Sequence, residues 1–306
     1  ERNESYFDRT KPKLDRVVFR IAPDAAGHTE QLLAGTLDFA CGITPADALR
    51  IAPRKDLRVV AFDNRQYDFV CWNTLRPPFD DADIRRALTL AIDRQALVDT
   101  LFKTYARVAS SPIPSTFWAH DPNLRPLPYD PAEARRILAM KGFSDSDGDG
   151  IVERQGRPFS FELTTNSSNR NRSAAVVMIQ EQLRKVGIAA TARTIEIHAL
   201  SDANRKHDFD ATISGWAIDT TLDLTPYFHS SESAGGYNIG SYQSLEADRL
   251  LEAARRAETP QAALPDLLRL QQVLHADQPF TFLWEPQRLC GVRADLIDVQ
   301  PNAISA

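Results

Sequence analysis

Residues 145–150, which read Asp-Ser-Asp-Gly-Asp-Gly, place acidic side chains at alternate positions. Oxygen ligands at this spacing, with a glycine for a sharp turn, are typical of the start of a calcium-binding loop. The twelfth position of such a loop supplies a bidentate glutamate, but here it is Gly156, and Glu153 at the ninth position replaces it only in part. We therefore expect a tight polar turn between a helix and a strand that holds no metal at physiological calcium.

The familiar signatures of catalysis are missing from the sequence. It contains no G-x-S-x-G nucleophile elbow, no glycine-rich dinucleotide or phosphate loop and no H-E-x-x-H zinc motif. Its six histidines are scattered, with no pair four residues apart that could share a metal on one helix face. We predict no catalytic residue, no bound metal and no cofactor, and therefore a protein that is not an enzyme.

The three cysteines, Cys41, Cys71 and Cys290, form no C-x-x-C pair. This excludes a disulfide scaffold and a cysteine-rich zinc site. Cys41 and Cys71 each end a predicted strand and could be neighbours in one sheet, so one bridge plus one free thiol is an alternative. We predict three free thiols, because adjacency in a sheet does not guarantee the geometry of a disulfide.

Composition restricts the class of protein further. The 306 residues suggest two lobes, or one large lobe with an attachment. A net charge of −5 without a basic face argues against nucleic acid as a partner. No apolar run approaches the roughly 18 residues that a membrane span requires. The first seven residues lack the pattern of a signal peptide, so export cannot be read from them.

Alternating strand and helix patterns predict an α/β architecture with mixed sheets. The expected strands are 16–21, 37–40, 57–62, 67–72, 159–164, 188–195, 209–214 and 280–284. The expected helices are 24–33, 84–102, 131–140, 176–186, 245–257 and 264–276. Residues 110–131 are rich in proline and predict an extended loop, after which Asp130 caps the helix that begins at Pro131.

The helix expected at 84–102 has the clearest periodicity. Its apolar residues fall near helical spacing and form one stripe, while Arg85, Arg86 and Arg94 are expected to face elsewhere. An aspartate at position 80 or 81 can cap it, because a carboxylate accepts hydrogen bonds from the free amides of the first turn.

Residues 77–94, which read PPFDDADIRRALTLAIDR, carry a specific signature. They closely resemble the helix segment of the oligopeptide/dipeptide/nickel class of solute-binding proteins of ABC importers, known as family 5. The resemblance continues in order along nearly the whole chain. It includes the segments at residues 2–15, 34–38, 129–150 and 215–219, and then Asn238, Ser241, Tyr242, Asp248, Leu250 and Leu251.

The resemblance implies a fold like that of periplasmic binding proteins, a two-lobed clamp with mixed sheets. Residues 1–70 would be the remaining part of lobe I, 71–284 lobe II, and 285–306 the return crossover and tail. Stretches 67–73 and 284–287 would be the hinge crossovers. These motifs occupy roughly the last three-fifths of the family's mature proteins, so the amino-terminal part of lobe I and an accessory lobe are expected to be absent. Exposed apolar surface is therefore expected around residues 17–21 and 280–284.

The function implied by the resemblance is that of an extracytoplasmic receptor. It would capture a peptide-like ligand between two lobes and deliver it to the membrane permease of an ABC importer, as a monomer in the periplasm or attached to the cell surface. The family also accepts nickel chelates, haem, oligosaccharides and opines. Two alternatives are the ligand-sensing part of a cytoplasmic transcriptional regulator and a calcium-dependent hydrolase, the latter based only on residues 145–149.

The resemblance also implies ligand-binding residues. In peptide-binding members, the acidic residue of a G-W-x-x-D motif holds the α-ammonium of the peptide. Carried over here, Asp219 is the anchor and Trp216 is an apolar wall beside it. Asp223 is a second candidate, because Asp223-Leu224 replaces the usual Asp-Pro, and Asn73 is a further candidate. The alternative for Asp219 is a carboxylate that only caps a turn.

Overall fold

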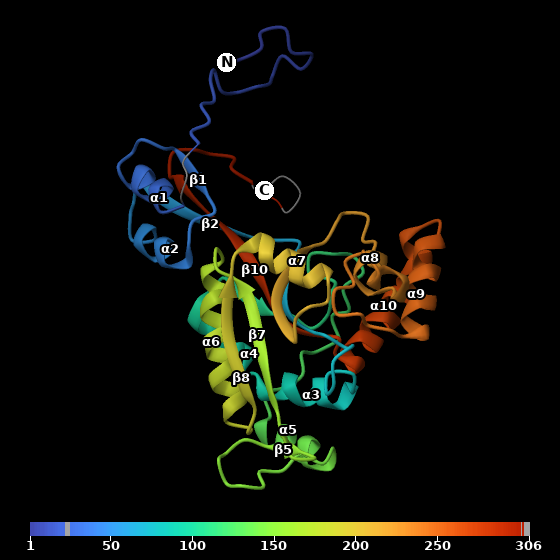
Figure 1. Ribbon diagram of the computed structural model, residues 1–306. Helices are drawn as coiled ribbons and strands as arrows, with labels where there is room; N and C mark the ends of the chain where they lie inside the picture. The colour runs from blue at the N-terminus through green and yellow to red at the C-terminus, as the bar shows by residue number, and fades with distance from the viewer. Residues whose placement is uncertain (22–24, 301, 303–306) are drawn as a thin grey trace. The chain divides into compact units, whose positions relative to one another are not determined.

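A computed structural model (Figure 1) describes residues 1–21, 25–300 and 302. The chain divides into two compact units. Among the described residues, unit 1 consists of those in 1–60 and 289–299, and unit 2 contains residues 61–288. The chain passes between the units within β2 (Leu57–Asp63) and β10 (Phe280–Arg293). Among the described helices, none combines the length and apolar character needed to cross a bilayer.

Unit 1 is built around the end of β10. The unit also contains α1 (Ala25–Leu33), β1 (Phe39–Cys41), α2 (Pro45–Ile51) and the first part of β2. β1 runs antiparallel to β10. A side chain at Gly291 of β10 would overlap Leu32 and Ile51, so a glycine lets α1 and α2 approach the strand.

Cys41 and Cys290 form a disulfide across β1 and β10. The two residues are direct partners in the antiparallel register, and their Cα atoms lie 4.1 Å apart. The prediction of three free thiols is therefore wrong for this pair, while Cys71 is free and buried in unit 2. No local pattern indicates the bridge, because 249 positions separate its cysteines.

The strand predicted at residues 16–21 is wrong. This segment has no regular structure, and the exposed fraction reaches 89% at Phe19 and 100% at Ile21. The expected exposed apolar surface is confirmed here, because an apolar run without a pairing strand cannot bury its side chains. At residues 280–284 the same expectation is wrong, since the start of β10 is paired with β3 and buried.

Unit 2 is organised by one mixed sheet, as predicted. Its strand order is β10-β3-β9-β7-β8, and β4 pairs with the other edge of β10. β3 is antiparallel to β10 and β9, whereas β7 is parallel to β8 and β9. The bounds are β3 (Gln66–Trp72), β4 (Ala106–Val108), β7 (Ser160–Asn166), β8 (Ala189–Ile195) and β9 (Ala211–Ala217). A two-stranded sheet joins β5 (Glu153–Arg154) and β6 (Arg157–Pro158).

Helices cover both faces of this sheet (Figure 1). Val70 and Trp72 of β3 belong to one core cluster, with α3 (Ala82–Ala91), α4 (Arg94–Leu101), α5 (Pro131–Met140) and α6 (Arg170–Arg184). Tyr67, Phe69 and Cys71 belong to the other, with α8 (Thr225–Phe228), α9 (Leu245–Arg256) and α10 (Pro260–Asp277). The remaining helices are α7 (Ile197–Arg205) and the short η1 (Ser230–Ser233). The alternation along β3 therefore separates two cores.

The long helix predicted at 84–102 is two helices, α3 and α4. Asp93 lies between them and caps α4 by accepting a hydrogen bond of 2.9 Å from the N–H of Ala96. Arg85 and Arg94 are buried, contrary to the expectation that they face away from the core. Their guanidinium groups donate to backbone carbonyl oxygens, which satisfies the buried charge. Burial lowers the pKa of Arg94 to about 10.

Candidate ligand-binding site

The candidate site lies at the end of β9, where the chain leaves the sheet of unit 2. Ile218, the first residue after the strand, donates its N–H to the carbonyl oxygen of Arg65 at 2.9 Å. Its own carbonyl oxygen accepts a hydrogen bond of 2.7 Å from the Arg65 guanidinium. Ile218, Leu222 and Leu224 are buried, whereas Asp219 is exposed. The loop is thus fixed to the core by apolar side chains while Asp219 faces solvent.

Asp219 caps the turn that follows it, and it keeps the capacity to bind a ligand. Its Oδ1 atom accepts hydrogen bonds from the Thr221 N–H at 2.9 Å and the Thr220 hydroxyl at 3.4 Å. The bonds from Thr221 first, and also the charge of Arg65, hold the pKa of the carboxyl below its usual value. An ionised carboxylate offers about four acceptor positions, so an exposed one with these bonds on Oδ1 can still accept through Oδ2.

Three aromatic rings, contributed by separate segments, pack beside this loop. Trp216 of β9 lies 5.1 Å from Tyr227 of α8 and 5.6 Å from Tyr237, and the two tyrosine rings lie 6.0 Å apart. We call these three residues the aromatic patch. The sequence pointed to Trp216 but to neither tyrosine. The signal that could have found Tyr237 is an aromatic residue directly after Gly-Gly in a polar segment.

Asp219 and Asp223 lie between two rings of the aromatic patch along the chain, since Trp216 precedes Asp219 by three positions and Tyr227 follows Asp223 by four. The pKa of Tyr227 is raised, first by burial and then by electrostatic interaction with Tyr237 and with the carboxylates of Asp219 and Asp223. Asp223 is half-buried, and its Oδ1 atom accepts the N–H of Thr225 at 2.9 Å, which holds it at the start of α8. The structure therefore brings together three of the four predicted site residues, two carboxylates and a tryptophan.

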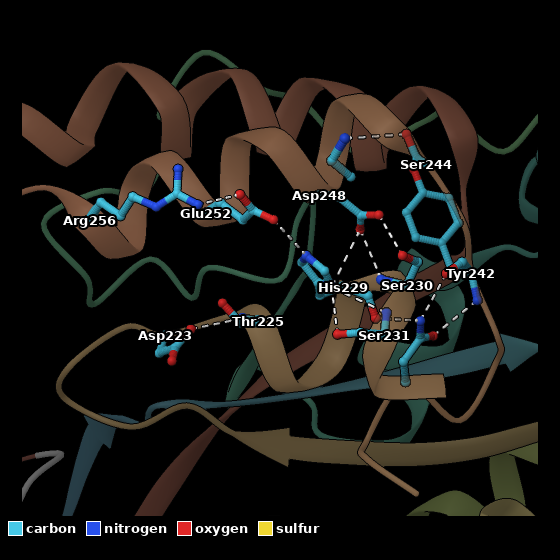
Figure 2. Close-up of polar contacts among 12 residues, drawn as sticks. Asp223, Thr225, His229, Ser230, Ser231, Tyr242, Ser244, Asp248, Glu252 and Arg256 are labelled. Atoms are coloured by element: carbon cyan, nitrogen blue, oxygen red, sulfur yellow. Dashed lines mark hydrogen bonds and ion pairs between the residues drawn. The ribbon is translucent and has the colours of Figure 1, made fainter. Parts of the chain in front are cut away.

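A polar network holds the short helices α8 and η1 against α9 (Figure 2). The carboxylate of Asp248 on α9 accepts the Ser230 N–H at 2.9 Å and the Ser230 hydroxyl at 2.5 Å. His229 lies between α8 and η1, and its Nε2 atom is 3.5 Å from the Glu252 carboxylate. Because α9 packs against α10 in the core, these contacts tie α8 and its Tyr227 to a rigid element.

Asn238 holds the loop that carries Tyr237. Its amide nitrogen donates to the carbonyl oxygens of His229 at 3.1 Å and Tyr242 at 2.8 Å, and its oxygen accepts the Tyr242 N–H. The N–H of Tyr237 donates to the carbonyl oxygen of Pro226 at 3.1 Å. The two tyrosine-bearing segments are thus joined by one backbone hydrogen bond and by the side-chain amide of Asn238.

Asn73 lies at the other end of the paired strands. It is buried and donates to the carbonyl oxygens of His207 and Phe209, at 2.9 and 2.8 Å, while its side-chain oxygen accepts the N–H of Leu75. Trp72 pairs with the first residue of β9, whereas Asp219 follows the last. At about 3.4 Å per residue, the seven residues of β9 span about 20 Å, and Asn73 and Asp219 lie beyond opposite ends of that span. The structure does not bring Asn73 to this site.

A second carboxylate of the same strands is fully enclosed. Asp68 of β3 is 3% exposed and accepts four hydrogen bonds. Two come from Arg172 of α6 at 2.9 and 3.0 Å, one from Gln66 and one from the indole of Trp284. Asp68 pairs with Gly215, directly before Trp216 in the register of β9.

The acidic turn at residues 145–150 is exposed. Carboxylate oxygens of Asp145, Asp147, Asp149 and Glu153 lie within 4.8 Å of one another. The aspartates also accept backbone N–H groups of the turn itself, for example those of Gly148 and Gly150 on Asp145. These bonds agree with the predicted polar turn, and its lack of metal at physiological calcium stays a prediction.

Comparison with known proteins gives one consistent family. A profile described as "Bacterial extracellular solute-binding proteins, family 5 Middle" matches residues 1–238. The oligopeptide-binding protein AppA of Bacillus subtilis (strain 168) is 33% identical over 291 residues, which cover 94% of this chain and 53% of that protein. The chain therefore spans about half the length of the curated relatives it matches.

Solved structures of similar proteins match this chain over most of its length. The oligopeptide-binding protein AppA from Bacillus subtilis, in complex with a nonapeptide, matches with a TM-score of 0.82 at 30% identity, covering 92% of this chain and 57% of that one. The substrate-binding protein CtaP of an ABC transporter from Listeria monocytogenes matches with a TM-score of 0.85 at 19% identity, covering 100% and 61%. The second likeness concerns the fold alone. The predicted α/β fold of periplasmic binding proteins is confirmed.

Proposed function

The chain belongs to family 5 of the bacterial extracellular solute-binding proteins, and we propose that it is part of a receptor that binds a peptide and delivers it to the permease of an ABC importer. We assign unit 1 to the remaining part of lobe I and unit 2 to lobe II. The receptor acts as a monomer and performs no chemistry on its ligand. The likeness to a peptide-binding relative supports peptide as the ligand.

The observation that carries this proposal is the exposed, ionised carboxylate of Asp219 beside the aromatic patch. An α-ammonium offers three donors and a full positive charge, which suits a carboxylate with free acceptor positions. Such a charge-assisted hydrogen bond contributes about 1.5–3 kcal/mol. Asp223 adds a second negative charge close to Tyr227, which favours a cationic group in the same place. Trp216 supplies an apolar surface next to it.

The disulfide between Cys41 and Cys290 supports a location outside the cytoplasm. Disulfides persist in oxidising compartments and are rare in the reducing cytoplasm. It therefore favours a periplasmic or surface-attached receptor over the ligand-sensing part of a cytoplasmic regulator. Thiol titration of the denatured protein should find one thiol, Cys71, before reduction and three after it. Three thiols before reduction would remove this support.

Calorimetry with defined probes tests the proposed function. We expect the purified protein to bind Ala-Ala-Ala at neutral pH and to bind N-acetyl-Ala-Ala-Ala at least about tenfold more weakly, because acetylation removes the ammonium. Haem and a nickel–histidine chelate serve as competing probes of the family's other ligand classes. Equal affinity for the two peptides, or binding of haem or the chelate alone, would contradict the proposal.

A further inference from the structure

The aromatic patch is exposed where most large apolar side chains of unit 2 are buried. Tyr237 is 57% exposed, and Trp216 and Tyr227 are half-buried. Below them, Phe69 of β3 lies 5.8 Å from Trp216 and stacks on Phe280 at 4.1 Å, so the patch rests on the core of the sheet. Clustered aromatic rings that stay open to solvent are typical of a surface that binds a ligand or another protein.

Contacts within the protein hold the patch in place. The hydrogen bond from Tyr237 to the carbonyl of Pro226 links the two tyrosine segments. Gly235 has a φ of 98°, and a side chain at Gly236 would overlap Glu232, so the two glycines allow the turn that presents Tyr237. The ring of Tyr237 meets Trp216 at 73°, an edge-to-face contact. A rigid, partly open arrangement of this kind can accept another flat or apolar group at low entropic cost.

We propose that the aromatic patch selects the side chain of the first ligand residue and favours aromatic and large apolar side chains there. This inference rests on the proposed function. The α-ammonium and the first side chain are attached to one Cα atom. An ammonium held by Asp219 therefore leaves that side chain within reach of the rings. Trp216 is three residues before Asp219, so their Cα atoms lie at most about 11 Å apart, and Tyr227 lies against Trp216.

The negative charges of Asp219 and Asp223 further restrict which first residue a ligand can carry. A ligand with aspartate or glutamate in first position would bring a negative charge towards Asp219 and Asp223, and such a like-charge approach is unfavourable. The rings offer apolar area and edge-to-face partners, which an alanine side chain uses hardly at all. Tyr237 is then the specificity-determining residue, because it is the most exposed of the three rings.

Calorimetry with Phe-Ala-Ala and Ala-Ala-Ala tests this inference. The protein should bind Phe-Ala-Ala at least about tenfold more tightly. Tyr237→Ala should reduce this ratio to about threefold or less, and Tyr237→Phe, which keeps the ring, should retain it. Tyr129→Ala is the matched control, since Tyr129 is also exposed but lies just before α5, whose buried residues belong to the other core of unit 2, and it should leave the ratio unchanged.

A ratio near one, a ratio that Tyr237→Ala leaves intact in a folded variant, or a preference for Lys-Ala-Ala or Glu-Ala-Ala would overturn the inference. Its failure is distinguishable from that of the proposed function. If N-acetylation weakens binding while the first side chain has no effect, peptide capture by Asp219 stands and selection by the patch does not.

Discussion

Asp68 and Asp219 are two aspartates carried by the same pair of strands, and their surroundings are opposite. Asp68 lies on β3 opposite Gly215, is buried, and uses both carboxylate oxygens in hydrogen bonds to Arg172, Gln66 and Trp284. Asp219 follows β9, is exposed, and has only a turn to cap. The first carboxylate is satisfied by the protein, whereas the second has acceptor capacity to offer a ligand.

This difference assigns Asp68 to the stability of the fold and Asp219 to the binding of a ligand. A buried ion pair that meets all its hydrogen bonds leaves nothing for a ligand and is costly to break. An exposed carboxylate contributes little to folding, so its presence beside three aromatic rings needs another reason. We therefore expect substitutions at the Asp68 site to change the free energy of unfolding, and substitutions at the Asp219 site to change affinity.

The largest expected effect is that of Asp68→Ala. The variant leaves the Arg172 guanidinium buried without its partner, and the free energy of unfolding should fall by about 3–5 kcal/mol. Urea denaturation measures this loss, and Asp68→Ala with Arg172→Met should recover part of it. Glu162→Ala is the control, because Glu162 pairs with Arg193 at the surface, and it should cost less than about 1 kcal/mol. Equal effects of Asp68→Ala and Glu162→Ala would show that the buried ion pair stabilises the fold no more than a surface ion pair does.

Gly215→Ala should have the next largest effect. The added methyl group would overlap both the Asp68 carboxylate and the Arg172 guanidinium, so the ion pair must move. We expect a loss of about 1–3 kcal/mol in the free energy of unfolding, as is typical of overpacking. Ala217→Ser, at the exposed end of the same strand, should change it by less than about 0.5 kcal/mol. A neutral Gly215→Ala would show that the enclosed site is looser than its contacts indicate.

Local patterns in the sequence predicted much of the fold. Asp130 caps α5 as its pattern predicts, with a hydrogen bond of 2.9 Å from Glu133, because caps and periodicity act over a few residues. The parts of the fold that local patterns did not predict depend on contacts between segments far apart in the sequence. The bridge between Cys41 and Cys290 depends on strand partners 249 positions apart, and the buried Arg85 and Arg94 depend on carbonyl oxygens supplied by distant segments.

The candidate site was predictable in part for the same reason. Asp219, Trp216 and Asp223 lie within eight consecutive positions, and the first two share one motif, so they could be found together. Tyr227 and Tyr237 reach Trp216 only through the packing of α8 and the loop after η1. Asn73 is at the opposite end of the strands, and only the antiparallel register of β3 and β9 reveals this.

The smallest expected effect is the dependence of affinity on pH in the acid range. The pKa of Asp219 lies below its usual value near 3.8, so the carboxylate stays ionised above that value and is protonated only as the pH falls through its lowered pKa. Affinity for Ala-Ala-Ala should therefore be nearly constant from about pH 7 to pH 5. It should weaken above about pH 8, where the peptide amine loses its proton. Calorimetry across this range that found a steep loss between pH 7 and 5 would point to a histidine instead.

Asp219→Asn, combined with acetylation of the ligand, shows whether Asp219 holds the α-ammonium. Calorimetry should show that the variant binds Ala-Ala-Ala about 10- to 100-fold more weakly than the unmodified protein does, since the charge-assisted bond is lost. For N-acetyl-Ala-Ala-Ala, whose ammonium is already absent, the variant and the unmodified protein should bind alike. If Asp219→Asn weakens both peptides equally, or weakens neither, Asp219 does not hold the ammonium.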